Sequence, residues 1–257
     1  MKKDLHISLV QYSIFWHNPL ANKKQIESML KGLKTDLVIL PEMFSTGFSM
    51  EAASLAETSD GETIRWMQAI AEQLNAAITG SVIIKEQEHF FNRLFFVFPE
   101  GKVETYDKRH TFSLAGEDKI YTKGKLRKTI TYLGWKILPQ ICYDLRFPVW
   151  ARNTDDYHFL YYVANWPTPR VAAWDALLKA RAIENMAYCV GVNRIGIDSN
   201  GMPYNGHSQV FDALGKELLE ETPEKEGVYT AVLSAEALNN QRNKLRFLED
   251  RDRFKLL

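Results

Sequence analysis

The chain has 257 residues, of which 46% are hydrophobic and 25% are charged, as in an ordinary globular protein. Lys plus Arg number 32, as do Asp plus Glu, so the formal net charge is zero and argues against binding to nucleic acid or an anionic membrane. Two cysteines, Cys142 and Cys189, are too few for a disulfide framework and favour a reducing compartment. With a polar N-terminus and no long apolar run, the sequence predicts a cytoplasmic protein.

Strand-like and helical patterns alternate along the first part of the chain. In order, we predict a strand at 5–14, a helix from Asn18-Pro19, a buried strand at 36–42, a helix over 64–74 and a strand at 76–84. The middle is richer in strands, which we place at 90–97, 103–106, 129–137, 137–142 and 159–164. A helix at 174–186, strands at 188–197, 206–211 and 227–233, and a charged helix with a tail complete the chain.

No repeat or Pro/Gly/Ser-rich linker divides the sequence, so we expect one domain over residues 1–257 with a C-terminal tail from about residue 240. The alternation of helices and strands predicts an α/β fold in which sheets stack inside and helices lie outside.

Polar residues follow three of the predicted strands. Glu42, Cys142 and Asn165 each come directly after an apolar run, and Lys108 lies in a loop after another strand-like segment. In α/β sheets the ligand crevice lies beyond the carboxyl ends of the strands. These side chains are therefore predicted to converge on one pocket.

A carboxylate, an ammonium and a thiol are sufficient for acyl transfer. A thiol is mostly protonated at neutral pH, so a base or a cation must activate it. Glu42 would take the proton of Cys142 and later give it to the leaving amine. Lys108 and the backbone N–H of Tyr143 would stabilise the tetrahedral oxyanion.

Other interpretations remain open at this point. A cysteine in an apolar segment is more often structural than catalytic, and Cys189 keeps that interpretation. A Cys–His dyad could instead pair Cys142 with His110 or His207. The six histidines have no metal-ligand spacing, and no phosphate-binding or dinucleotide motif is present, so we expect neither a metal nor an organic cofactor.

Several blocks of sequence resemble the nitrilase superfamily of carbon–nitrogen hydrolases, in the order of that family and over essentially the whole chain. They lie at 37–44, 106–110, 141–148, 165–167, 181–185, 193–196 and 206–208. The resemblance implies a four-layer αββα sandwich and the same roles for Glu42, Lys108 and Cys142. It also implies that Glu117 positions Lys108 or the substrate amide, and that the protein is a homodimer paired through helices near the Cys and Asn-Trp-Pro motifs.

Within the superfamily, the stretches 43–50, 107–112, 115–117 and 165–170 resemble the bacterial omega-amidase (2-oxoglutaramate amidase) branch. Such enzymes release ammonia from the terminal amide of 2-oxoglutaramate or 2-oxosuccinamate and leave a 2-oxo dicarboxylate. Val149 departs from the pattern, because many relatives carry Glu there. The alternatives are another amidase, nitrilase or carbamoylase of the superfamily, and a non-catalytic scaffold with the same fold.

A 2-oxo acid substrate carries a carboxylate that needs a cationic partner. Arg146, Arg170 and Arg109 are candidates, although Arg146 could instead pair with Asp144 or contact another subunit. Further candidates for the substrate pocket are Phe48, Phe112, Asn165 and Trp166, of which the aromatic residues could equally belong to the core.

Overall fold

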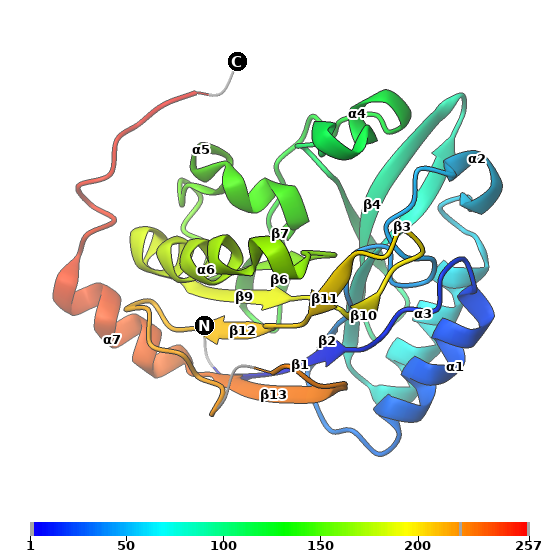
Figure 1. Ribbon diagram of the computed structural model, residues 1–257. Coiled ribbons are helices and arrows are strands. Elements are labelled where there is room, and N and C mark those ends of the chain that lie inside the picture. Colours follow the sequence, from blue (N-terminus) through cyan, green and yellow to red (C-terminus); the bar gives the residue numbers. More distant parts are fainter. Residues whose placement is uncertain (1–2, 221–222, 256–257) are drawn as a thin grey trace.

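The computed structural model describes residues 3–220 and 223–255 and is built around two β-sheets (Figure 1). The first sheet has the strand order β13-β1-β2-β3-β4-β5. Its strands are β1 (Leu5–Gln11), β2 (Leu37–Ile39), β3 (Ala77–Glu86), β4 (His89–Val97), β5 (Val103–Asp107) and β13 (Gly227–Leu233). Strand β2 is parallel to both β1 and β3, so their carboxyl ends lie at one edge of the sheet.

The second sheet has the order β12-β9-β8-β7-β6. Its strands are β6 (Ile130–Tyr132), β7 (Trp135–Ile141), β8 (Phe159–Val163), β9 (Tyr188–Val192) and β12 (Gln209–Phe211). Strands β7, β8 and β9 are parallel, and Cys142 follows β7 directly. A separate hairpin of β10 (Ile195–Ile197) and β11 (Pro203–Asn205) follows β9.

Helices cover the outer face of each sheet (Figure 1). On the first sheet lie α1 (Pro19–Leu30) and α3 (Glu62–Leu74), whose apolar side chains form one buried cluster with the sheet. On the second lie α5 (Pro148–Ala151) and α6 (Val171–Asn185). The short helices α2 (Ala52–Leu55) and α4 (Glu117–Ile120), the 3-10 turns η1 (Ser113–Ala115), η2 (Cys142–Arg146) and η3 (Thr168–Arg170), and the C-terminal helix α7 (Ala235–Leu245) complete the described elements.

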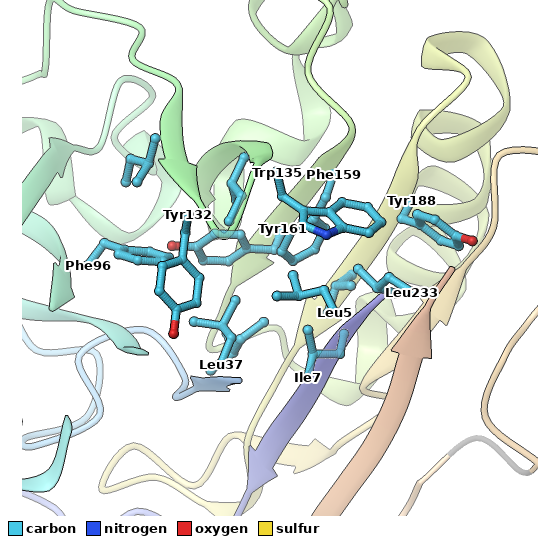
Figure 2. Close-up of a cluster of buried hydrophobic side chains, with 14 of the residues drawn as sticks. Leu5, Ile7, Leu37, Phe96, Tyr132, Trp135, Phe159, Tyr161, Tyr188 and Leu233 are labelled. Atoms are coloured by element: carbon cyan, nitrogen blue, oxygen red, sulfur yellow. The ribbon is translucent and has the colours of Figure 1, made fainter. Parts of the chain in front are cut away.

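The inner faces of the two sheets pack against each other (Figure 2). Aliphatic side chains of the first sheet meet aromatic rings of the second in one buried cluster, which includes Leu5, Leu37, Trp135, Phe159 and Tyr161. The Tyr161 hydroxyl is hydrogen-bonded across the layers to Thr79 Oγ1 at 2.7 Å, which satisfies a polar group inside this core. The four layers confirm the predicted αββα sandwich.

Local sequence chemistry explains where the first helix begins. The Asn18 side chain accepts a hydrogen bond from the backbone N–H of Ala21, and Pro19 occupies the first helical position, as predicted.

Some predicted boundaries are wrong. The segment 129–137 is not one strand, because Leu133 and Gly134 adopt positive φ and turn the chain between β6 and β7. The strand predicted at 188–197 is interrupted after Val192, because the backbone N–H of Asn193 donates to Ser208 Oγ. Strand β1 ends at residue 11 rather than 14, and β2 covers only 37–39 rather than 36–42. Helix α7 continues to residue 245, so the C-terminal tail begins later than residue 240. The last two tail residues, 256–257, lie outside the described residues.

Candidate active site

The carboxyl ends of strands from both sheets meet at a cavity of about 460 Å³. Strand β7 delivers Cys142 to it, β8 leads to Asn165, and Lys108 follows β5. Most of the site residues predicted from the sequence line this cavity: Glu42, Phe48, Lys108, Phe112, Cys142, Tyr143, Arg146, Asn165, Trp166 and Arg170. The two exceptions are Arg109 and Glu117, of which Glu117 lies buried behind Lys108.

Lys108 lies between two buried carboxylates. Its Nζ donates to Glu42 Oε1 at 2.8 Å and to the two oxygens of Glu117 at 3.0 and 2.9 Å. All three side chains are almost completely excluded from solvent. A buried ion triad keeps its geometry, because displacing any member would leave an unpaired charge in a low-dielectric interior.

Amide and backbone donors fix the two carboxylates further. Asn92 Nδ2 donates to Glu42 Oε1 at 2.8 Å and to Glu117 Oε1 at 3.3 Å. The backbone N–H of Asn165 donates to Glu42 Oε2 at 2.9 Å. Asn92 was not predicted, although a lone asparagine within the aromatic run of β4 (His89–Val97) was a usable signal.

Burial and neighbouring charge shift the protonation equilibria of the triad. Burial alone would lower the pKa of Lys108, but the negative charges of Glu117 and Glu42 outweigh it and raise that pKa, so the ammonium stays charged. Burial raises the pKa of Glu117 above its usual value, and the nearby Lys108 opposes the shift. The site thus holds one permanent cation between two carboxylates.

The Cys142 thiol faces this cluster. Burial raises its pKa well above the ordinary value, and the charge of Glu42 and a thiol hydrogen bond to that carboxylate add to the shift. The thiol is therefore protonated at neutral pH and needs a base at the moment of attack. Cys142 also has a φ of 42°, in the left-handed region that non-glycine residues rarely adopt and that is concentrated at functional sites.

Two of the three candidate arginines line the cavity. The Arg146 guanidinium carbon lies 5.0 Å from the centroid of the Trp166 ring, and that of Arg170 lies 5.3 Å from Phe112. Within the described chain, neither guanidinium makes an ion pair with a carboxylate. Arg109 is turned elsewhere, since it donates to the Gly124 carbonyl and lies over Trp150.

Several residues of the cavity wall were not predicted. Trp16 reaches it from the loop after β1, and Met202 and Tyr204 reach it from the β10–β11 hairpin. Gly47 permits this placement of Trp16, because it has a φ of 82° and a Cβ there would lie 2.8 Å from the Trp16 ring. Trp16 lies far from Met202 and Tyr204 in the sequence, and no motif joins them.

The two histidines considered as partners of Cys142 are engaged elsewhere. His110 Nδ1 hydrogen-bonds Asp144 Oδ1 at 2.7 Å, His207 Nδ1 lies 3.1 Å from Asp175, and neither histidine lines the cavity. The alternative of a Cys–His dyad is therefore wrong. In the part of the chain that the structure describes, no cluster of three or more His, Cys, Asp or Glu side chains could hold a metal ion, and no helix has the length and apolarity to cross a membrane.

Residues 6–243 match the model of the carbon–nitrogen hydrolase family, so the chain belongs to this family, the nitrilase superfamily. More particularly, it is 44% identical over 256 residues to the omega-amidase YafV of Yersinia enterocolitica, covering 98% of this chain and 99% of that protein. The 2-oxoglutaramate amidase of Bacillus subtilis is 29% identical over 95% of this chain and 96% of its own. A superfamily crystal structure from Xanthomonas campestris, with an arsenic adduct in its active site, has a TM-score of 0.96 and 44% identity over 99% of this chain and 100% of that one. The predicted superfamily is thus confirmed.

Proposed function

We propose that this protein is an omega-amidase that hydrolyses the terminal amide of 2-oxoglutaramate or 2-oxosuccinamate to the 2-oxo dicarboxylate and ammonia. The observation that carries this proposal is a cavity that combines a protonated thiol beside Glu42, a buried ammonium and two arginines. The similarity to proteins named omega-amidase and 2-oxoglutaramate amidase supports the same substrate class.

In the acylation step, Cys142 Sγ attacks the carbon of the terminal amide. Glu42 accepts the thiol proton as the S–C bond forms, because it is the carboxylate that lines the cavity together with Cys142 and Lys108. The C–N bond then breaks, the nitrogen takes the proton from Glu42, and ammonia leaves. The acyl group remains on Cys142 as a thioester.

Negative charge develops on the carbonyl oxygen in this step. Lys108 Nζ is the cation available to it at the cavity wall, and the backbone N–H of Tyr143 is the second donor. Glu117 keeps Lys108 charged and oriented, since both of its oxygens accept hydrogen bonds from the same Nζ. Its task is to position the cation rather than to contact the substrate.

In the deacylation step, a water molecule takes the place of ammonia. Glu42 removes a proton from it, the hydroxide attacks the thioester carbon, and the C–S bond breaks. The proton returns from Glu42 to Cys142, so the enzyme regains its starting state. One carboxylate, held by Lys108, Asn92 and Asn165, can serve both steps because its position does not depend on the substrate.

The charge of the cavity wall favours an anionic substrate. Arg146 and Arg170 line it, and their guanidinium groups lie against aromatic rings. A guanidinium over an aromatic face keeps donors free in its own plane, which suits bidentate binding of a carboxylate. These arginines are our candidates for the 2-oxo acid end of the substrate, with Phe48, Phe112 and Trp166 as apolar walls.

We extend the proposal to organisation and location. The two sheets share one buried cluster, which supports a single domain. Exposed Val149 on α5 and Ile183 on α6 offer apolar surface for the proposed homodimer. Cytoplasmic location remains our proposal, because Cys142 must stay a free thiol to react.

The test is ammonia release from a panel of 2-oxoglutaramate, 2-oxosuccinamate, a neutral aliphatic amide, a nitrile and a ureide. We expect the two keto-amides to react fastest and Cys142→Ala to be inactive. Cys189→Ala is the matched control, because that thiol is buried in β9 away from the cavity. Equal or faster turnover of the neutral amide, nitrile or ureide would instead assign the protein to another activity of the superfamily.

A further inference from the structure

A buried carboxylate outside the predicted site, that of Asp144 in η2, makes four hydrogen bonds. Its Oδ2 accepts from the backbone N–H of Ile141 at 3.0 Å and from the Tyr106 hydroxyl at 2.8 Å. Its Oδ1 accepts from the backbone N–H of His110 at 2.9 Å and from His110 Nδ1 at 2.7 Å. Each oxygen therefore has two donors, which is a complete set for a buried carboxylate.

The four donors come from two segments that carry reacting groups. Ile141 directly precedes Cys142, while Tyr106 and His110 lie two residues before and two residues after Lys108. Ile141 is the last residue of β7 in the second sheet, whereas Tyr106 lies in β5 of the first sheet and His110 in the loop that follows it. One carboxylate thus ties the nucleophile to the cation across the two halves of the sandwich.

The hydrogen bond to Ile141 also explains how Cys142 keeps its left-handed backbone. Asp144 reaches back to the N–H of Ile141 and closes the turn around Cys142, whose φ is 42°. A non-glycine residue holds such a conformation only where its surroundings impose it. In this conformation Cys142 lines the same cavity as Glu42 and Lys108.

The donors of Asp144 are themselves held in place. The Tyr106 hydroxyl accepts a hydrogen bond from Trp150 Nε1 at 3.0 Å, and the His110 ring stacks on Phe147 with a centroid distance of 3.8 Å. The alternative pairing of Asp144 with Arg146 is wrong, because both carboxylate oxygens of Asp144 are hydrogen-bonded to other residues. The carboxylate is thus a fixed junction rather than a mobile surface charge.

We infer that Asp144 is a positioning residue of the hydrolytic site, whose carboxylate sets the placement of Cys142 relative to Lys108. This inference rests on the proposed function, because it gives Asp144 a task in that same reaction. Asp144 does not line the cavity and so does not meet the substrate. Its loss should therefore lower kcat, because misplacing a reacting group by about 1 Å can slow a reaction about 100-fold, while KM stays nearly constant.

The test is Asp144→Asn, which keeps the shape but replaces one accepting oxygen by an NH₂ group. For ammonia release from 2-oxoglutaramate we expect kcat to fall about 100-fold with KM within about threefold of wild type. Alkylation of Cys142 by iodoacetamide should also slow, because the thiol loses its alignment with Glu42. Asp144→Glu, which restores a carboxylate, should recover part of both rates.

Asn153→Ala is the matched control for general destabilisation. Asn153 is buried and donates to the carbonyls of Tyr157 and Asn185, but it lies outside the cavity wall. This variant should melt at a lower temperature and keep its kcat. An Asp144→Asn enzyme with kcat within about threefold of wild type, or with a loss equal to that of Asn153→Ala, would overturn the inference.

Two further measurements keep the inference testable. If Asp144→Asn does not fold, Tyr106→Phe replaces it as the test, because it removes one hydrogen-bond donor to Asp144 Oδ2. The kcat of Tyr106→Phe should fall about tenfold at constant KM. An unchanged kcat counts against the inference. If the wild type releases no ammonia from any amide, the proposed function fails, but alkylation still tests the position of Cys142. Unchanged or faster alkylation in Asp144→Asn then contradicts the role of Asp144.

Discussion

The inner and outer parts of the cavity are built in different ways. At the inner end, Glu42, Lys108 and Glu117 are almost fully excluded from solvent, and each has more than one hydrogen-bond partner. At the outer end, Arg146 and Arg170 lie against aromatic rings and are at least partly exposed. The side chains of the inner end keep one geometry, because any other would leave a buried charge unpaired. The exposed side chains of the outer end can change rotamer when a ligand binds.

We infer that the buried inner end of the cavity serves bond breaking and that the exposed outer end serves substrate recognition. Substitutions at the inner end should lower kcat for every substrate, because they act on the transition state. Substitutions at the outer end should change the preference between substrates, because they act on a group remote from the reacting carbon.

The largest effect is expected for Cys142→Ala, which removes the proposed nucleophile. Ammonia release should fall about 10⁴-fold or more for every amide, since loss of a nucleophile abolishes the covalent route. Steady-state assays with a keto-amide and a neutral amide measure this. Residual activity near the wild-type level would show that another group attacks the substrate. The inner end of the cavity would then not be the site of bond breaking.

Glu117→Gln should separate activity from stability. We expect kcat to fall about 100-fold, because Lys108 loses one of its two carboxylates. The pKa of Glu117 is raised in the folded state, so its ionised form costs stability, and this cost grows as pH rises above the unfolded value. At neutral pH the variant should therefore melt no lower than the wild type. The measurement is the melting temperature of Glu117→Gln and of the wild type at acid and neutral pH. A lower melting temperature of the variant at neutral pH would contradict the prediction.

Arg170→Gln and Arg146→Gln should act on substrate preference. We expect each to lower kcat/KM about 10- to 100-fold for 2-oxoglutaramate and to leave a neutral amide nearly unaffected, because a charge-assisted hydrogen bond is lost. Arg109→Gln is the matched control, since Arg109 binds the Gly124 carbonyl outside the cavity. Equal losses on both substrates would mean that these arginines support the inner end instead.

The smallest effect is expected for His110→Ala. A histidine acting as the general base would cost several orders of magnitude when removed, but here the carboxylate of Glu42 faces the thiol. His110→Ala deletes one of the four donors to Asp144 and keeps the backbone donor. We therefore expect a loss of less than about tenfold in kcat at constant KM. A loss as large as that of Cys142→Ala would restore histidine as the base.

Local patterns in the sequence were enough to place most strands and helices and the polar residues that follow them, although 129–137 and 188–197 were wrongly predicted as single strands. Asn18 and Pro19 specify the start of α1 through a cap and a fixed φ, and the apolar run before Cys142 specifies β7. Motif order determined the superfamily and the αββα sandwich. The cap and the apolar run are local features, because each depends on residues that are neighbours along the chain, whereas the order of the motifs is a property of the whole sequence.

Which side chains share the site depends on how the two sheets pack. Asn92 on β4 meets Glu42, which follows β2, because the two strands lie in one sheet with only β3 between them. Arg109 lies outside the cavity that Arg146 and Arg170 line, because its side chain binds the Gly124 carbonyl. The task of Asp144 depends on donors about 35 residues away on the other sheet. Such contacts join residues that no spacing rule connects, since packing of the layers, and not local propensity, brings them together.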